Sequence, residues 1–386
     1  MTTRRDFLKT VSLAGGAAMV DLRSLSGQLL NPTGFRLNEF IETHPDAVFI
    51  LRTNVDVKTN AAAIKTVGYQ LGHTLFVPGP FMNSRAVDDP VVIKPNVTAW
   101  AGGIPPLDFE QIMGIQTDPN FVEGVIQSLR ELGISNKNMY MREANFADDR
   151  IDGQWYHDMA KRAGVNFQDF PPIGELPESA IQWIEVPNGV WYSRIPYLAP
   201  VNSPLSTVIN IAKFKSHGMG MTLCSKNLQG TNARPYVMHC TQLSADYGVN
   251  PKDIVPNARA TIQSNYERHR DAGIPRWDLP GEATGGLCQE THASRCLDNN
   301  SVIHPLINIV EGVYGREGSH VAGPSDNGGL WKRHHDEHRD VWEEGHPCGS
   351  HRYVPFGTRA WKLRVLPSCA RTRNAAASQP AKCSSV

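Results

Sequence analysis

The chain has 386 residues, of which 40% are hydrophobic and 20% are charged. This composition is typical of a globular protein with a substantial core, and it excludes an intrinsically disordered chain. Because 38 Lys and Arg residues balance 38 Asp and Glu residues, the formal charge is zero and no nucleic-acid partner is expected.

The first residues predict an export signal. The stretch TRRDFLK, residues 3–9, resembles the twin-arginine motif, and the mildly apolar TVSLAGGAAMV follows it. An apolar stretch of roughly eleven residues is too short to span a membrane but suits a signal h-region. The resemblance implies export of the folded chain by the twin-arginine translocation machinery to a periplasmic or other extracytoplasmic location. A basic amphipathic first helix is the alternative. Residues 1–30 are the expected signal region, and without a clear A-x-A site it is either cleaved or kept as an anchor.

Short apolar runs then alternate with amphipathic segments, which predicts one α/β domain over residues 31–330, with a mixed or mostly parallel sheet flanked by helices. The expected strands are 47–51, 91–94, 138–143, 206–215 and 304–314. The expected helices are 60–71, 119–132, 155–163 and a short one at 222–228. The second of these is marked most clearly, by Asp118 as N-cap, Pro119 at the first helical position and Gly133 as the stop.

The composition changes at residues 331–386, which form an atypical tail with neither helical nor alternating periodicity. We expect this tail to be disordered, badly diverged or read out of frame. Its three close histidines, His334, His335 and His338, are not expected to bind a metal, because no second carboxylate–histidine group supports a site.

The seven cysteines show no C-x-x-C spacing, so the sequence indicates neither an iron–sulfur cluster nor a zinc knuckle. Cys288 and Cys296 either form a local disulfide or remain buried thiols. The chain also lacks a G-x-S-x-G elbow, a Walker motif and a dinucleotide glycine fingerprint, so no cofactor is identified.

Lysines gather where the predicted strands end. Alternation along the strand places Lys213, Lys215 and His217 on one face as that strand finishes. Lys94 and Asn96 end an earlier strand in the same way. A single lysine at a strand end is usually a solvated surface residue, but packing gives no reason for such clustering. Because ligands in open α/β sheets bind outside the carboxyl ends of the strands, we expect a binding site there.

Further residues extend this expected site. The run Gly218-Met219-Gly220 permits a sharp turn into a short helix, whose free N–H groups would suit phosphate or carboxylate. Lys226 and Asn227 come about one turn later and can reach back. Glu143 ends a third expected strand, where it would orient a lysine, act as a base or bind a metal.

These segments resemble the domain of unknown function 362 family. The similarity rests on VIKPN at 92–96, TDP at 117–119, NIAKFKSH at 210–217 and KNLQG at 226–230, and it extends over about residues 47–330. Ala212, Ser216 and Asp118 stand where the family usually has Pro, Thr and His. Many members carry a ferredoxin-like iron–sulfur segment, but the cysteine run for it is missing here. The resemblance implies an architecture and a set of residues, but no general reaction.

Our leading hypothesis is an exported α/β protein that binds an anionic small molecule or cofactor, with redox activity as one form of it. The expected ligand-binding residues are Lys94, Asn96, Lys213, Lys215, Lys226 and Asn227. In an enzyme, His217 would transfer protons because its ordinary pKa is near neutrality, and Glu143 would be the second acid or base. Cys224 is either a nucleophile or a small buried residue. The alternative is a non-catalytic extracytoplasmic ligand- or metal-binding protein, with His217 and Glu143 or Asn227 as metal ligands.

Overall fold

The computed structural model describes residues 34–79, 84–97, 114–144, 154–167, 172–217, 220–237, 243, 248–274 and 286–315. The expected signal region and the atypical tail lie outside these residues. Among the residues described, no helix is long and apolar enough to cross a bilayer.

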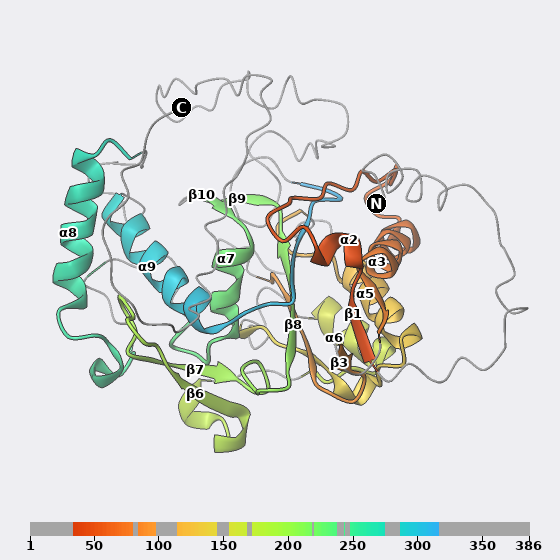
Figure 1. Ribbon diagram of the computed structural model, residues 1–386, viewed down its shortest axis with the longest axis horizontal. Coiled ribbons are helices and arrows are strands. Elements are labelled where there is room, and N and C mark those ends of the chain that lie inside the picture. The colour runs from red at the N-terminus through yellow and green to blue at the C-terminus, as the bar shows by residue number, and fades with distance from the viewer. Residues whose placement is uncertain are drawn as a thin grey trace, which may run out of the picture.

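The elements follow one another along the chain as Figure 1 labels them. The strands are β1 (Gly34–Leu37), β2 (Phe76–Gly79), β3 (Arg85–Ala86), β4 (Val91–Pro95), β5 (Met139–Met141), β6 (Ile181–Glu185), β7 (Arg194–Leu198), β8 (Thr207–Lys213), β9 (Lys215–His217), β10 (Gly220–Thr222) and β11 (Ile307–Glu311). The α-helices are α2 (Glu39–Glu42), α3 (Ala61–Leu75), α5 (Pro119–Glu131), α6 (Gln154–Ala163), α7 (Cys224–Asn227), α8 (Ala258–Asp271) and α9 (Gly286–Val302). Short 3-10 helices are η3 (Asn136–Asn138), η5 (Ile173–Glu175), η6 (Glu178–Ala180), η7 (Leu228–Thr231) and η8 (Pro251–Asp253).

The main sheet has four parallel strands in the order β11-β8-β4-β5, which confirms the predicted parallel α/β architecture. The chain passes from β4 to its neighbour β5 on one side and later returns to β8 on the other side. The order therefore reverses between β4 and β8. In open α/β sheets such a reversal opens a crevice at the carboxyl ends of the two strands.

Helices cover both faces of this sheet. Ile93 and Ile211 belong to the core shared with α3, α5 and α6, whereas Val92 and Val208 belong to a second core that includes Ile262 of α8. Figure 1 shows these two sets of helices on opposite sides of β8. Burial on both faces explains why β4 and β8 read as continuous apolar runs rather than as alternating ones.

The helix α5 forms as its sequence predicts. The Asp118 side chain caps it by accepting from the backbone N–H of Asn120 at 2.8 Å, and Pro119 occupies the first turn. Gly133 follows its end with a φ of +91°, in the left-handed region that favours glycine. Its apolar face is buried against the sheet and α3 through Phe121, Val122, Val125, Ile126 and Leu129.

Smaller antiparallel sheets surround the main one. They have the orders β2-β1-β3, β6-β7 and β10-β9. The last is a hairpin that begins two residues after β8 ends, and Figure 1 shows it beyond the end of β8, next to α7.

The predicted strand at 47–51 is wrong. These residues have no regular secondary structure, and Val48 and Ile50 are 69% and 83% exposed. A strand forms only where its backbone pairs with another strand, and residues 47–51 pair with none in the described part of the chain.

The structure also settles the alternatives for two cysteines. Cys288 and Cys296 both lie in α9, eight residues apart, and both keep their thiols. Such a spacing corresponds to about 12 Å along a helix axis, too far for a disulfide.

Candidate functional site

Four parallel strands end at one edge of the main sheet, and each carries a charged side chain there. The register aligns Lys94 of β4 with Asn210 of β8, and Lys213 with Glu311 of β11. Glu143 follows the end of β5 by two residues. Strand order, which the sequence alone does not give, therefore brings the predicted strand ends together.

Lys94 and Glu143 form a fully buried ion pair. Lys94 Nζ donates to Glu143 Oε2 at 2.6 Å, to the Pro95 carbonyl at 2.6 Å and to Asn227 Oδ1 at 3.1 Å. These three bonds use all three N–H groups of the ammonium. Burial lowers the pKa of Lys94, and the neighbouring Glu143 charge opposes that effect.

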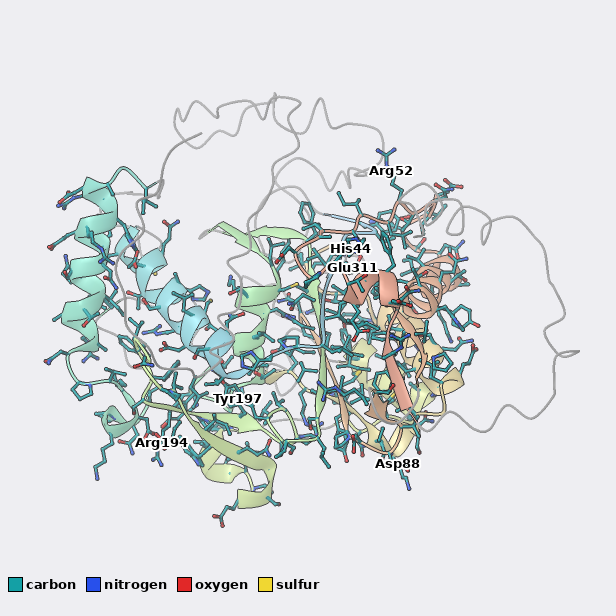
Figure 2. All side chains as sticks on the ribbon, in the orientation of Figure 1. His44, Arg52, Asp88, Arg194, Tyr197 and Glu311 are labelled. Atoms are coloured by element: carbon teal, nitrogen blue, oxygen red, sulfur yellow. The ribbon has the colours of Figure 1, made fainter. Side chains whose placement is uncertain are left out.

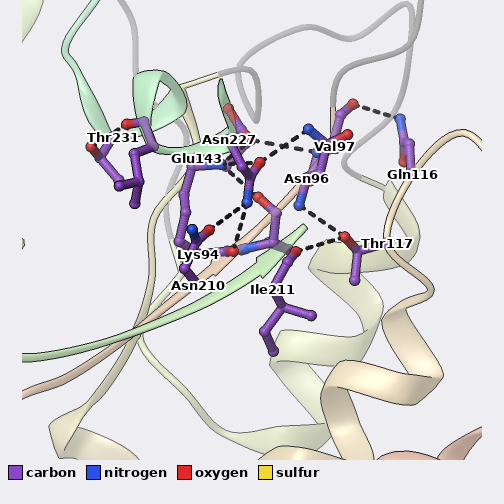
Figure 3. A network of polar contacts seen from close by, with 12 residues as sticks. Lys94, Asn96, Val97, Gln116, Thr117, Glu143, Asn210, Ile211, Asn227 and Thr231 are labelled. Atoms are coloured by element: carbon purple, nitrogen blue, oxygen red, sulfur yellow. Dashed lines mark hydrogen bonds and ion pairs between the residues drawn. The ribbon is translucent and has the colours of Figure 1, made fainter. Parts of the chain in front are cut away.

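Asn96 and Thr117 fix the chain where it leaves and re-enters this edge (Figure 3). The Asn96 N–H donates to Thr117 Oγ1 at 3.0 Å, and the Thr117 N–H donates back to the Asn96 carbonyl at 2.8 Å. The Thr117 hydroxyl donates to the Ile211 carbonyl at 2.9 Å, which ties this connection to β8. The backbone around Asn96 is thus held in one position above the reversal between β4 and β8.

A second ion pair lies on the other face of the sheet. Lys213 Nζ donates to Glu311 Oε2 at 2.6 Å, and the same oxygen accepts from the Asp118 N–H at 3.2 Å. Glu311 is 2% exposed, whereas the labelled Arg52 and Asp88 lie at the periphery in Figure 2. Burial, followed by the Glu311 charge, raises the pKa of the Asp118 carboxyl to about 6.

Lys215 and Lys226 complete the cationic cluster. Lys215 is 5% exposed at the start of the β9–β10 hairpin, where it pairs with Thr222. Burial lowers its pKa well below the ordinary value; the charge of Lys226 lowers it further, Glu143 opposes this, and Lys213 and Lys94 add to the lowering. The other three lysines therefore all lie within electrostatic range of Lys215.

Glycine at position 230 allows a close approach to this cluster. A Cβ there would lie 2.5 Å from Glu143 Oε1 and 2.7 Å from Lys94 Nζ. No side chain fits at that distance, so the absence of one lets the η7 backbone pack directly onto the ion pair.

The sequence placed several of these residues differently. The expected strand through residue 215 ends at Lys213, and a hairpin stands where a turn into a helix was expected. The helix α7 begins only after that hairpin and has four residues, so no anion site is assigned to its start. Lys213 and Lys94 lie on opposite faces of the sheet, because Lys213 continues the Ile211 face and Lys94 continues the Val92 face.

One predicted site residue cannot be placed by its side chain, and three residues of the site were not predicted. The backbone of His217 belongs to β9, but its side chain lies outside the described part of the structure. Glu311, Asn210 and Asp118 were not expected in the site. Glu311 could have been found from the sequence, because it is a carboxylate near the end of a predicted strand.

The described residues support neither a metal site nor a thiolate nucleophile. They contain no group of three or more His, Cys, Asp or Glu side chains placed to hold a metal ion. Burial raises the pKa of the Cys224 thiol to about 12, so this cysteine is a thiol rather than a thiolate near neutrality.

No curated protein and no solved structure matches the chain. A family model does match, that of the domain of unknown function (DUF362), over residues 91–329. The match includes β4, β8 and β11 with the charged edge, and it spans more than half of the chain. The chain therefore belongs to the DUF362 family.

Proposed function

We propose that this protein binds an anionic small molecule or cofactor at the charged edge of the main sheet. The observation that carries the proposal is the convergence of four lysines at the reversal of strand order, where α/β proteins bind ligands. Two of the lysines, Lys94 and Lys213, are neutralised by buried carboxylates. Lys215 and Lys226 add two further amines to this edge.

Electrostatics favour an anion over a neutral ligand. Burial is the main cause of the lowered pKa of Lys215, and repulsion from the charge of Lys226 adds to it. A bound phosphate, sulfate or carboxylate would offset this repulsion and bring Lys215 back towards its charged form. Asn96, whose Nδ2 donates to Asn227 Oδ1 at 3.0 Å, lies at the same edge and supplies a neutral polar group for the rest of the ligand.

The proposal takes a catalytic form if His217 faces the bound anion. The imidazole would then transfer protons, with redox chemistry supplied by the ligand if it is a redox cofactor. Glu143 would hold Lys94 in place as well as serve as the second acid or base. Replacing His217 by Ala separates an enzyme from a simple binder, because turnover would collapse while anion affinity would survive.

We further propose that the twin-arginine translocation machinery exports the protein to an extracytoplasmic location. The support is the TRRDFLK segment and the apolar stretch after it. Changing Arg4 and Arg5 to Lys should leave the chain in the cytoplasm, as fractionation of the expressing cells would show. Unchanged export would refute this part and leave the binding proposal intact.

Thermal shift measurements with sulfate, phosphate and citrate test the binding proposal. We expect the wild type to be stabilised, by about 2.7 kcal/mol at an anion concentration of 100 times the dissociation constant. Lys215→Met and Lys226→Met should each weaken the affinity at least tenfold. Lys252→Met, at an exposed lysine of η8, is the matched control and should bind as the wild type does. Equal binding by all four proteins would refute the proposal.

A further inference from the structure

The orientation of the side-chain amides at the charged edge is fixed by Lys94. An ammonium group only donates hydrogen bonds, so the Asn227 atom 3.1 Å from Lys94 Nζ has to be the oxygen. The Asn227 nitrogen consequently faces the other way, towards the Lys94 carbonyl at 3.2 Å and Asn210 Oδ1 at 2.8 Å.

The same constraint passes along a chain of amides. Because Asn210 presents its oxygen to Asn227, its nitrogen donates to Asn308 Oδ1 at 2.8 Å and to the Cys224 carbonyl at 3.0 Å. Each amide thus has a single orientation that agrees with its neighbours. This chain of oriented amides starts at the Lys94 ammonium and ends at the exposed Asn308.

Asn227 also fixes the orientation of the Asn96 amide. Asn227 Oδ1 accepts a second hydrogen bond from Asn96 Nδ2 at 3.0 Å (Figure 3). If the Asn96 amide were reversed, two oxygens would face each other. Asn96 Oδ1 therefore points away from Asn227, and this buried oxygen has no hydrogen-bond donor among the described residues, although Asn96 is only 4% exposed.

A buried acceptor without a donor is unfavourable, and it is uncommon in folded proteins. The bonds to Thr117 fix the Asn96 backbone, and the bond from Asn96 Nδ2 to Asn227 fixes the orientation of its side chain. The oxygen is held beside the lysine cluster, in a region where the ligand is expected to arrive. A ligand that brings a donor would satisfy it.

We propose that Asn96 Oδ1 accepts a hydrogen bond from a hydroxyl group of the ligand, so that the ligand is a hydroxylated anion. This inference rests on the anion binding proposed above and adds the group that lies beside the negative charge. Two sources share this chemistry, namely hydroxycarboxylates and phosphorylated polyols. Anions without a hydroxyl leave the Asn96 oxygen unsatisfied and bind more weakly for that reason.

Matched pairs of anions test the inference by isothermal titration calorimetry. One pair is glycolate and acetate, and the other is glycerol 3-phosphate and propyl phosphate. In the wild type, the hydroxylated member of at least one pair should bind at least tenfold more tightly, and that pair identifies the source. This comparison needs no variant, so it does not depend on how well a variant folds.

Variants then assign the preference to one atom. Asn96→Leu removes the acceptor at nearly the same size, and the two members of each pair should then bind equally. Asn308→Leu is the matched control, because Asn308 lies at the far end of the amide chain and is exposed. It should keep the wild-type preference, and a preference that survives in Asn96→Leu would overturn the assignment.

The outcomes also separate this inference from the proposal on which it rests. If both members of each pair bind equally well to the wild type, and Lys215→Met still weakens them, anion binding stands and the hydroxyl preference is refuted. If none of the four anions binds the wild type, both proposals fall.

Discussion

The ion pair between Lys94 and Glu143 has little access to water, with side chains 0% and 1% exposed. Removing two charges from water is costly, and the attraction between them repays this only when further hydrogen bonds satisfy both groups. Here the Pro95 carbonyl and the Asn227 amide complete the bonding of the lysine. The pair is therefore a means of holding amide groups in position rather than a large net source of stability.

This interpretation predicts strong non-additivity between two substitutions. Lys94→Met leaves a buried carboxylate without its partner and should lower the free energy of unfolding by about 3–5 kcal/mol. Glu143→Gln alone should cost a similar amount. The double variant should lose clearly less than the sum, because no unpaired charge remains. Urea denaturation of the four proteins gives the coupling, and additive losses would show that the two groups act independently.

Among the helices, α3 and α5 pack unusually closely because glycines line their contact. A Cβ on Gly68 of α3 would lie 2.0 Å from the Phe121 carbonyl oxygen, and one on Gly124 of α5 would lie 2.1 Å from the Lys65 carbonyl oxygen. Both neighbours are backbone atoms, which a side-chain rotation does not move. The start of α5 lies at the charged edge, where the Asp118 N–H donates to Glu311.

Alanine at either helix glycine should separate the two helices. We expect Gly68→Ala and Gly124→Ala to lower the free energy of unfolding by about 1–3 kcal/mol through overpacking, despite the better helix propensity of alanine. Gly174→Ala is the matched control, since nothing lies within 4 Å of the Cβ it would add. Thermal unfolding of the three variants would check this, and a neutral or stabilising change at both helix positions would contradict the close packing.

The sequence predicted elements well where the signal was local. The α5 helix carried an N-cap, a proline and a stop glycine, and it forms within those limits. The strand at 47–51 was predicted from hydrophobicity alone, and it failed because a strand depends on a partner elsewhere in the chain. The hairpin of β9 and β10 was missed because the glycines within it fit several kinds of turn.

At the scale of the whole molecule, the parallel sheet gathers charges of both signs at one edge. The sequence could place lysines at the ends of individual strands, and that expectation led to Lys94 and Lys213. It could not place Glu311 opposite Lys213, since this contact joins residues 98 positions apart through the order of the strands. Nor could it show that the two lysines lie on opposite faces of the sheet.

The pH dependence of folding should report the carboxyl group of Asp118. Its pKa of about 6 in the folded protein is above the ordinary value of 3.8, so the folded state binds more protons between these values. Stability should therefore fall as pH rises from about 4 to about 6, by up to about 3 kcal/mol, and stay level above that range.

Asp118→Asn tests this without removing the helix cap, because asparagine is an equally good N-cap. The variant should unfold at a higher denaturant concentration than the wild type at pH 7 and at a similar one at pH 4. Asp88→Asn, at an exposed aspartate, is the control and should keep the wild-type pH profile. A wild-type profile in Asp118→Asn would show that another group is responsible.

Proton uptake on anion binding tests the central claim most directly. Sulfate does not titrate near neutrality, so its binding at pH 8 can be followed by calorimetry in buffers of different ionisation enthalpy. The account predicts that the wild type takes up protons as sulfate binds, because the anion raises the lowered pKa of Lys215, and that Lys215→Met takes up none. Sulfate binding without proton uptake in the wild type, or with the same uptake in Lys215→Met, would contradict it.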